Sequence, residues 1–357
     1  KCLPKIKLNH LFRLTDNFGI VRFAKLTRRD ASSGYTLDDN AQALAAAALY
    51  YAKFGAPSKR LLTVTQKNRL LGLINTYLDF IAFVTMPDYS FQNFVSADKA
   101  LDESLNEQNN SENASAFALY ALTLTSTTGS LPAAVRQKAF TLLRNSIAKS
   151  AYFDSPRAIA VYVKALHVLR DKKVEITGID LERTLQNQCD KLVHLYQETV
   201  SPEWRWFESY LAYSNGVLPE ALLLGYRVTG DERYLAVGKT TLDFLIEESF
   251  VDDVYKAIGQ DSQPHKNDKR RYYDQQPEEV QSMVSALGAC YSVTGDENYS
   301  RLMHRVFYWF LGDNSVNQVI YDRATGGCYD GVGKRTINLN QGARATIAYL
   351  LARLAFE

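Results

Sequence analysis

Ten residues that occur twice constrain the fold of this chain more than any other feature of its sequence. The segment YRVTGDERYL (Tyr226 to Leu235) returns as YSVTGDENYS (Tyr291 to Ser300), shifted by 65 residues. In each copy a glycine can end one helix in a left-handed conformation, and the aspartate after it can cap the next helix. The motif therefore predicts two tight joints between consecutive helices.

Similar joints surround Gly55, Gly129 and Gly178, and apolar residues recur at helical spacing along nearly the whole chain. This pattern predicts an all-α fold of helical hairpins. The first helix of each hairpin is expected to start near one of these positions: Asp39, Glu112, Pro156, Leu218, Pro277 and Gln341. The N-terminal segment IKLNHLFRLTD would supply the partner of the last helix.

Six stacked hairpins predict a closed ring, an (α/α)6 toroid with an inner and an outer ring of helices. We expect residues 1–357 to form one toroid domain. Because the sequence starts with Lys1, we expect it to be part of a longer chain or a processed product. A two-domain helical protein and an open solenoid are the alternatives.

Composition excludes several other classes of function. The net charge of +2 is too small for a nucleic-acid-binding surface. No apolar run is long enough to span a membrane. The four cysteines show no CxxC and no His-linked spacing, so we expect no metal, and we expect no cofactor.

Polar residues concentrate just before each predicted inner helix. These segments read GYTLDDN, NNSEN, YFDSPR, EWRWFESYLAYSNGVLPE, YYDQQPEE and INLNQGA. In a ring of parallel inner helices they all lie at one rim, where aligned helix dipoles favour negative charge. Helix caps explain the Ser, Asp and Asn residues but not the Trp, Glu and Gln residues beside them. The rim is therefore the predicted binding site.

Asp38 and Asp39 open the first inner helix. Asp39 with Gln42 three residues later matches a capping box, which favours a structural role for Asp39. Asp38 lies outside that cap, so it is the better candidate for chemistry.

Glu208 lies in the segment WRWFES with Trp204 and Trp206. Aromatic faces can cover the C–H surface of a sugar, and a carboxylate can bind hydroxyls or transfer protons. In the competing interpretation the tryptophans form an apolar stripe and Glu208 is a surface residue.

The segment DQQPEEV offers further candidates, because Pro277 fits the first helical position. The amides of Gln275 and Gln276 could bind a polyol, whereas Glu278 and Glu279 could simply complement the helix dipole.

His10 is the histidine nearest to a rim segment, and a structural role competes with a role as a base. The basic loop Lys256–Asp274 is predicted either to cover the rim and contact an anionic ligand through Arg270 or Arg271, or to be a solvated loop. Tyr213, Tyr273 and Arg271 would also permit lyase chemistry.

Taken in order, several of these segments resemble a bacterial family of (α/α)6-toroid modules. The motifs are HLFRLTDNFGIVRFA, GYTLDDNAQAL, WFESYLAYSNGVLPEALL, YDQQPEEV, YDRATGGCYDG and INLNQGARATIAYLLA, from about Ile6 to Leu354. The family is part of the six-hairpin glycosidase-like group and occurs alone or C-terminal to glycosyltransferase modules. The resemblance implies the toroid fold, an oligosaccharide or glycan ligand, and a glycosyltransferase module as a possible partner.

The chain also differs from the family pattern at three positions, because Gln42 replaces an Arg, Ser214 an Asp and Arg344 an acid. The start of the chain, KCLPKIKLNHL, resembles the junction that follows a glycosyltransferase module, which favours a cytoplasmic protein over an exported one. The rim residues that match the family are Asp38, Asp39, Asn40, Glu208, Asn215, Gln275, Gln276, Glu279, Asn340 and Gln341.

A glycoside hydrolase is the leading hypothesis from the sequence. One rim carboxylic acid would protonate the leaving oxygen and another would act as base or nucleophile, with Asp38 and Glu208 as the expected pair. Glu279 is the next candidate if either of these two is not catalytic. Asp39 is a further candidate, because two adjacent aspartates are similar to the arrangement in bacterial α-1,6-mannanases. The alternatives are a non-catalytic saccharide-binding module, a sugar epimerase and a lyase. We expect neither nucleic acid nor membrane as a partner.

Overall fold

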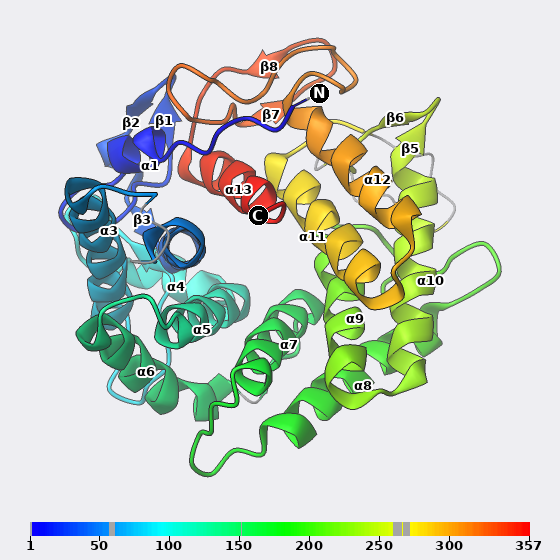
Figure 1. The fold of residues 1–357 in the computed structure, drawn as a ribbon, viewed down its shortest axis with the longest axis horizontal. Coiled ribbons are helices and arrows are strands. Elements are labelled where there is room, and N and C mark those ends of the chain that lie inside the picture. The colour runs from blue at the N-terminus through cyan, green and yellow to red at the C-terminus, as the bar shows by residue number, and fades with distance from the viewer. Residues whose placement is uncertain (1, 57–60, 151, 260–265, 267–271) are drawn as a thin grey trace.

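A computed structural model of the chain describes residues 2–56, 61–150, 152–259, 266 and 272–357. Within these residues, an inner ring consists of α2 (Leu37–Tyr50), α5 (Glu112–Thr127), α7 (Pro156–Asp171), α9 (Val217–Thr229), α11 (Pro277–Thr294) and α13 (Ala343–Leu354). Each inner helix packs against the next, and α13 packs against α2, so the ring is closed (Figure 1).

An outer ring covers the inner one. It consists of α3 (Val64–Phe83), α6 (Ala133–Ile147), α8 (Leu181–Thr199), α10 (Glu232–Ser249) and α12 (Glu297–Phe307), and each of these packs against the inner helix before it. The short α1 (Asn9–Leu14) packs against α13, as predicted for the N-terminal segment. The predicted (α/α)6 toroid is confirmed, and every inner helix begins within two residues of its predicted start.

The repeated ten-residue motif forms two nearly identical joints. Gly230 and Gly295 end α9 and α11 with φ angles of 71° and 69°, in the left-handed region that favours glycine. Asp231 and Asp296 then each accept a hydrogen bond of 2.9 Å from the backbone N–H two residues later and cap α10 and α12. Both predictions from the repeat are confirmed.

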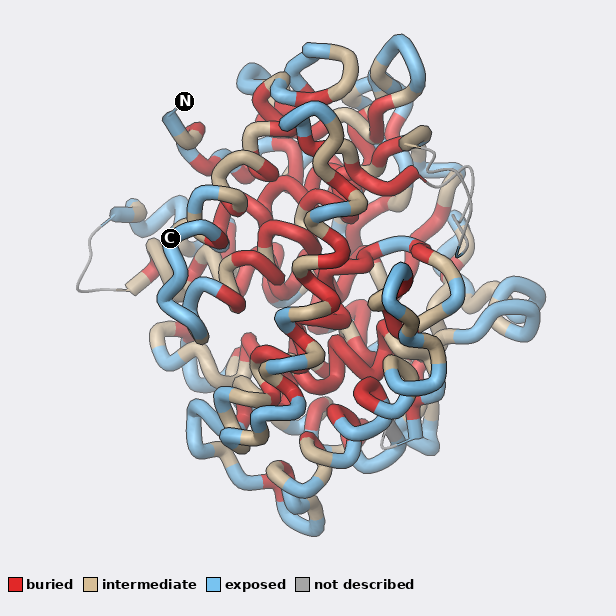
Figure 2. Tube along the Cα trace, turned by 90° about the vertical axis from the view of Figure 1, so that its right-hand side faces the viewer, coloured by how far each residue is buried: buried red, intermediate tan, exposed pale blue. Residues whose placement is uncertain are grey.

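The hydrophobic core lies between the two rings, and Figure 2 shows the buried residues concentrated there. Alanines at positions 41, 43 and 45–48 of α2 are almost fully buried, since small side chains let the inner helices approach closely. None of the helices in the described segments has the length and apolar character that a membrane-spanning helix requires. The four cysteines are free thiols.

Short elements connect the helices. They are α4 (Glu103–Gln108), the hairpins β1 (Ala24–Lys25) with β2 (Arg28–Arg29) and β5 (Phe250–Val251) with β6 (Val254–Tyr255), and the antiparallel pairs β3 (Tyr35–Thr36) with β4 (Phe94–Val95) and β7 (Gly331–Val332) with β8 (Ile337–Asn338). Strand β3 leads directly into α2, and Gln275, just before α11, pairs with Val332 of β7.

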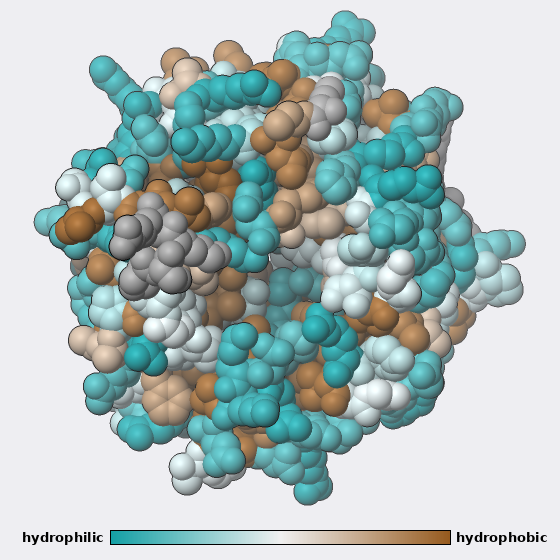
Figure 3. Space-filling view, in the orientation of Figure 1, coloured by the Kyte–Doolittle hydropathy of each residue, from teal (hydrophilic) through white to brown (hydrophobic). Residues whose placement is uncertain are grey.

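The two ends of the ring differ in what they expose. We call the end where the inner helices begin the N-terminal rim, and the opposite end the C-terminal face. The C-terminal face is turned towards the viewer in Figures 1 and 3, and Figure 3 shows that it is hollowed near the centre of the ring.

Candidate saccharide site at the N-terminal rim

The start of α2 differs from the predicted capping box. Thr36 is the N-cap: its Oγ1 accepts a hydrogen bond of 3.1 Å from the backbone N–H of Asp39 and donates one of 2.8 Å to Asp39 Oδ2. The predicted Asp39–Gln42 box is wrong because the helix begins two residues earlier. Gln42 Nε2 instead donates to Asp38 Oδ1 at 2.8 Å, one helical turn away.

Arg344 gathers three carboxylates at the rim, and we call these four residues the Arg344 cluster. Its Nη2 binds Asp38, its Nη1 lies 3.4 Å from Glu278 Oε2, and its Nε lies 3.7 Å from Asp39 Oδ1. The three residues that differ from the family pattern, Gln42, Ser214 and Arg344, all contact this cluster or belong to it. Gln42 donates a hydrogen bond to Asp38, and Ser214 Oγ donates one of 3.0 Å to Glu278 Oε1.

The charges of the Arg344 cluster compensate one another. An arginine in the first turn of a helix opposes the helix dipole, but the carboxylates of Glu278 and Asp38 stabilise its charge and raise its pKa. Burial raises the pKa of Asp39, and the charge of Arg344 opposes that shift. Asp39 Oδ1 is buried and accepts no hydrogen bond from any described residue.

A second cluster surrounds Arg157, the second residue of α7. Its Nη1 donates to both carboxylate oxygens of Glu208, at 3.1 and 2.9 Å, and its Nη2 donates to Asn215 Oδ1 at 3.2 Å. Asn215 in turn donates to both oxygens of Glu279, through Nδ2 at 2.9 Å and through its backbone N–H at 3.0 Å. We call Arg157, Glu208, Asn215 and Glu279 the Arg157 cluster.

Glu279 is the most strongly perturbed carboxyl group of this cluster. Burial raises its pKa to about 7, although the hydrogen bonds from Asn215 act in the opposite direction. Only 3% of the residue is exposed. A pKa near 7 would suit a general acid. However, both carboxyl oxygens of Glu279 accept hydrogen bonds from Asn215, and the residue is buried.

One segment ties the two clusters together, because consecutive residues bind consecutive glutamates. Ser214 donates to Glu278 and Asn215 donates to Glu279. Ser214 adopts a left-handed conformation with φ 47°, which turns the chain between these two contacts. The ring of Tyr213 lies 5.0 Å from the guanidinium carbon of Arg157, and its hydroxyl accepts a hydrogen bond from Asn113.

A pocket of about 370 Å³ opens beside the Arg344 cluster, and we call it the rim pocket. Its walls come from the starts of α2, α11 and α13 and from the loops before them. The lining residues are Arg22, Phe23, Thr36, Asp39, Asn93, Phe94, Gln276, Pro277, Glu278, Asp330, Gly342, Arg344 and Ala345. Phe23 is 54% exposed. The guanidinium carbon of Arg22 lies 4.8 Å from the ring centre of Phe23 and 5.5 Å from that of Phe94.

Four predicted binding residues are instead buried in structural contacts within the protein. The amides of Asn40, Gln275 and Gln341 are fully buried. Asn40 accepts from the N–H of Ile20 at 2.8 Å, Gln275 bonds Trp309 and Ser315, and Gln341 bonds Asp322 and Thr325. His10 is also fully buried, with Nε2 2.8 Å from the carbonyl of Gln341, and burial lowers its pKa.

The two tryptophans are a correction to the sequence prediction. Trp204 is 1% exposed and Trp206 is fully buried, so neither presents a ring face to a ligand. Trp204 packs edge-on against Phe244 and donates to the carbonyl of Glu208 at 2.7 Å. Both rings therefore support the segment that carries Glu208.

The remaining predicted residues have mixed placements. Gln276 lines the rim pocket. Asn340 accepts a hydrogen bond of 2.9 Å from the backbone N–H of Leu26. Arg270 and Arg271 lie outside the described residues.

Sequence reasoning missed the roles of Arg157, Arg22, Phe23 and Asp330. Arg157 carried a usable signal: an arginine in the first turn of an inner helix opposes the dipole, so it indicates a carboxylate nearby. Asp330 accepts a hydrogen bond of 2.7 Å from the backbone N–H of Gly342, and burial raises its pKa. Its position depends on a long loop, which local sequence does not reveal.

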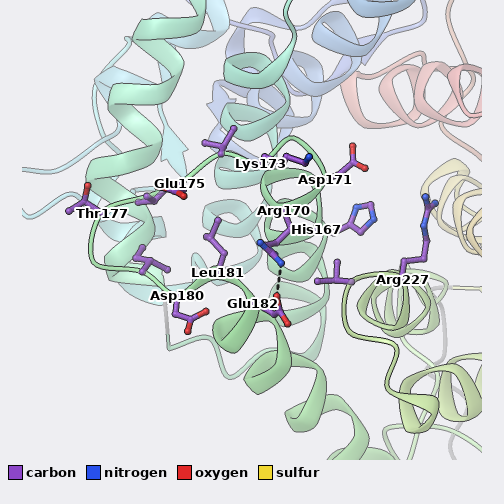
Figure 4. A pocket seen from close by; sticks show the side chains of 14 residues that line it. His167, Arg170, Asp171, Lys173, Glu175, Thr177, Asp180, Leu181, Glu182 and Arg227 are labelled. Carbon is purple, nitrogen blue, oxygen red and sulfur yellow. Dashed lines mark hydrogen bonds and ion pairs between the residues drawn. The ribbon is translucent and has the colours of Figure 1, made fainter.

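A larger cavity of about 820 Å³ lies on the C-terminal face, beyond the end of α7. Figure 4 shows its charged side chains, with Arg170 paired to Glu182. Three cations, Arg170, Lys173 and Arg227, face four carboxylates, Asp171, Glu175, Asp180 and Glu182. Among the described residues, no Phe, Tyr or Trp side chain lines this cavity, in contrast to the rim pocket.

The fold is thus an (α/α)6 toroid. The chain resembles a solved D-mannose isomerase (TM-score 0.70, 12% identity, 98% of this chain and 94% of that chain covered). It also resembles the cellobiose 2-epimerase of Bacillus thermoamylovorans, with a TM-score of 0.67 and 14% identity over 98% of this chain and 96% of that chain. A GH76 α-mannanase of Bacteroides thetaiotaomicron is similar with a TM-score of 0.57 and 11% identity over 90% of this chain and 85% of that chain. At these identities the likeness establishes the fold. No family model and no curated protein matches the sequence.

Proposed function

We propose that this chain recognises a saccharide and binds one sugar unit in the rim pocket. The observation that carries the proposal is the composition of that pocket, where fixed charged groups lie beside an exposed aromatic ring. Asp39 offers an oxygen that accepts no hydrogen bond from the described residues, Arg344 offers donors held by carboxylates, and Phe23 offers an apolar face. Sugars present hydroxyls at their edges and C–H groups on their faces, so they match both kinds of group.

The fold supports the same ligand class. The similar structures described above are named for mannose, cellobiose and α-mannan, and they span isomerase, epimerase and hydrolase activities. A shared ligand class with differing reactions favours a saccharide over any single chemistry.

Recognition fits the rim better than hydrolysis by Asp38 and Glu208. Both oxygens of Glu208 accept hydrogen bonds from Arg157, and Asp38 is held by Arg344 and Gln42. Proton transfer to a glycosidic oxygen requires a carboxyl oxygen that can approach it closely. In both carboxyl groups each oxygen already has one of these partners.

Calorimetric titration of the purified protein with mannose, glucose, cellobiose and mannobiose tests the proposal. We expect saturable binding of at least one sugar, weakened at least tenfold by Arg344→Met, since one charge-assisted contact is worth about 1.5–3 kcal/mol. Arg301→Met on the exposed side of α12 is the matched control and should leave the affinity unchanged. Absence of binding to every sugar, or equal affinity in Arg344→Met, would refute recognition at this site.

A second candidate is a glycoside hydrolase that uses Asp39 and Asp330. Both carboxyl groups line the rim pocket, and burial raises the pKa of each. A raised pKa keeps a carboxyl group protonated for acid catalysis. This candidate predicts release of reducing sugar that is lost in Asp39→Asn and in Asp330→Asn, and a wild-type protein that binds sugar without any product would exclude it.

A further inference from the structure

A second groove, separate from the rim pocket, lies on the C-terminal face. Four segments form it: α1 and the chain leading into it, the end of α2 and the turn Tyr51–Gly55 after it, the start of α3 and the residues just before it, and the last turn of α13 with the residues that follow. Its volume is about 600 Å³, within the usual range of ligand sites. We call it the basic groove.

The basic groove has a strong excess of positive charge. Five cations, Lys5, Lys7, Arg13, Arg69 and Arg353, line it with a single carboxylate, Glu357, which leaves four positive charges. Glu357 pairs with Arg353 at 2.8 Å, so it neutralises none of the other four cations. The whole chain carries a net charge of only +2, so the excess is local.

Helix dipoles explain only part of this excess. Arg13 and Arg353 lie in the last turns of α1 and α13, where a cation is favourable in any case. Lys5 and Lys7 precede α1, and Arg69 lies in the second turn of α3, so no helix C-terminus accounts for them. No described carboxylate forms an ion pair with Lys5, Arg13 or Arg69.

The floor of the groove is apolar. The rings of Tyr50 and Phe54 lie 4.7 Å apart at the end of α2, and the guanidinium carbon of Arg69 lies 4.5 Å above the ring of Phe12. Leu61 extends the floor and is 59% exposed. Figure 3 shows hydrophobic surface beside hydrophilic surface over this part of the ring.

Neither of the other two sites described above combines these properties. The cavity of Figure 4 has more carboxylates than cations. In the rim pocket Arg344 forms ion pairs with carboxylates of its own cluster. The basic groove thus pairs uncompensated cations with an aromatic floor, which is the complement of an anion on an apolar body.

We propose that the basic groove binds an amphiphile with a phosphate head group on an alkyl chain. Arg13 and Arg69 would bind the head group through their guanidinium forks, which match phosphate geometry. The ring floor of Phe12, Tyr50 and Phe54 would cover the chain. A phosphate is favoured over a carboxylate because four uncompensated charges suit a dianion. The inference does not rest on the proposed saccharide site at the rim.

The test compares the proposed kind of ligand with compounds that have only its alkyl chain or only its phosphate. Dodecyl phosphate, the uncharged octaethylene glycol dodecyl ether, dodecanoate and inorganic phosphate are titrated into the full chain by calorimetry, below the micellar concentration of each detergent. We expect one dodecyl phosphate per chain, bound at least tenfold more tightly than each of the other three. Equal binding of the uncharged ether would show that charge plays no part and would overturn the proposal, and equal binding of dodecanoate would overturn the phosphate assignment.

Variants locate the binding. Arg13→Gln with Arg69→Gln should weaken dodecyl phosphate binding at least tenfold, whereas the matched pair Arg301→Gln with Arg183→Gln, on the outer helices α12 and α8, should not. All four side chains are on the surface, so the variants should keep their circular dichroism and melting temperature, which are measured alongside. Unchanged affinity in the groove variant, or many weak binding events in all proteins, would overturn the proposal.

Discussion

Arg157 donates from a single nitrogen, Nη1, to both carboxylate oxygens of Glu208, at 3.1 and 2.9 Å. Only 7% and 11% of the two side chains are exposed. The pair joins the start of α7 to the segment before α9, so it fixes the geometry of the rim between two hairpins.

Breaking this pair is expected to destabilise the protein strongly. Arg157→Met leaves the Glu208 carboxylate nearly buried and without its cationic partner, which should lower the free energy of unfolding by about 3–5 kcal/mol. The exposed pair Lys138–Asp79 is the control, where Lys138→Met should cost no more than about 1 kcal/mol. Urea denaturation measures both, and similar small losses would mean that the Arg157–Glu208 pair has no structural role.

Glu279 is expected to make stability depend on pH. Its pKa is about 7 in the folded state against 4.5 as the ordinary value, so between these values the folded state holds a proton that the unfolded state has lost. The free energy of unfolding should therefore fall as the pH rises from 4.5 to 7, by about 3 kcal/mol, and then stay level.

The Glu279→Gln variant should lose this dependence, whereas Glu203→Gln at an exposed position should retain it. Urea denaturation at pH 5, 6, 7 and 8 gives the slope. An identical slope for wild type and Glu279→Gln would contradict the assignment.

Aromatic residues at the rim should separate into two classes. Phe23→Ala should weaken sugar binding about five- to tenfold with little change in melting temperature, because the ring is 54% exposed at the rim pocket. Trp204→Ala should cost about 3–5 kcal/mol of stability, because that ring is buried in the core. A binding loss confined to Trp204→Phe, which preserves packing, would reverse these assignments.

Asp39→Asn should weaken sugar binding about tenfold and leave stability nearly unchanged. The amide still accepts the hydrogen bond from Thr36, while the costly buried negative charge is removed. Asp98→Asn, on an exposed loop, serves as the control in the same titration. Full affinity in Asp39→Asn would remove this residue from the site.

The repeated joints offer a test of the fold itself. Gly230→Ala and Gly295→Ala should each cost about 1–2 kcal/mol, because alanine is strained at φ angles near 70°. Gly129→Ala is the matched control, since it lies in a joint without positive φ and has nothing within 4 Å of an added Cβ. Thermal melts compare the three variants, and equal effects would mean that the left-handed caps contribute little.

The sequence by itself determined the ring. Helix starts at Pro156 and Pro277, the joints at Gly230 and Gly295, and the spacing of six hairpins follow from interactions within a few residues. Such local interactions are written in consecutive positions, so the toroid and its N-terminal rim could be predicted.

Only the tertiary structure decided what the rim residues do. Asn40 and Gln275 look like binding amides in the sequence but complete backbone hydrogen bonds or buried contacts, whereas Arg157 and Arg344 hold the carboxylates expected to be free. The reason is physical. The ion pairs join partners 51 residues apart for Arg157 with Glu208 and 306 residues apart for Arg344 with Asp38. Such partners come together only when the ring of helices closes.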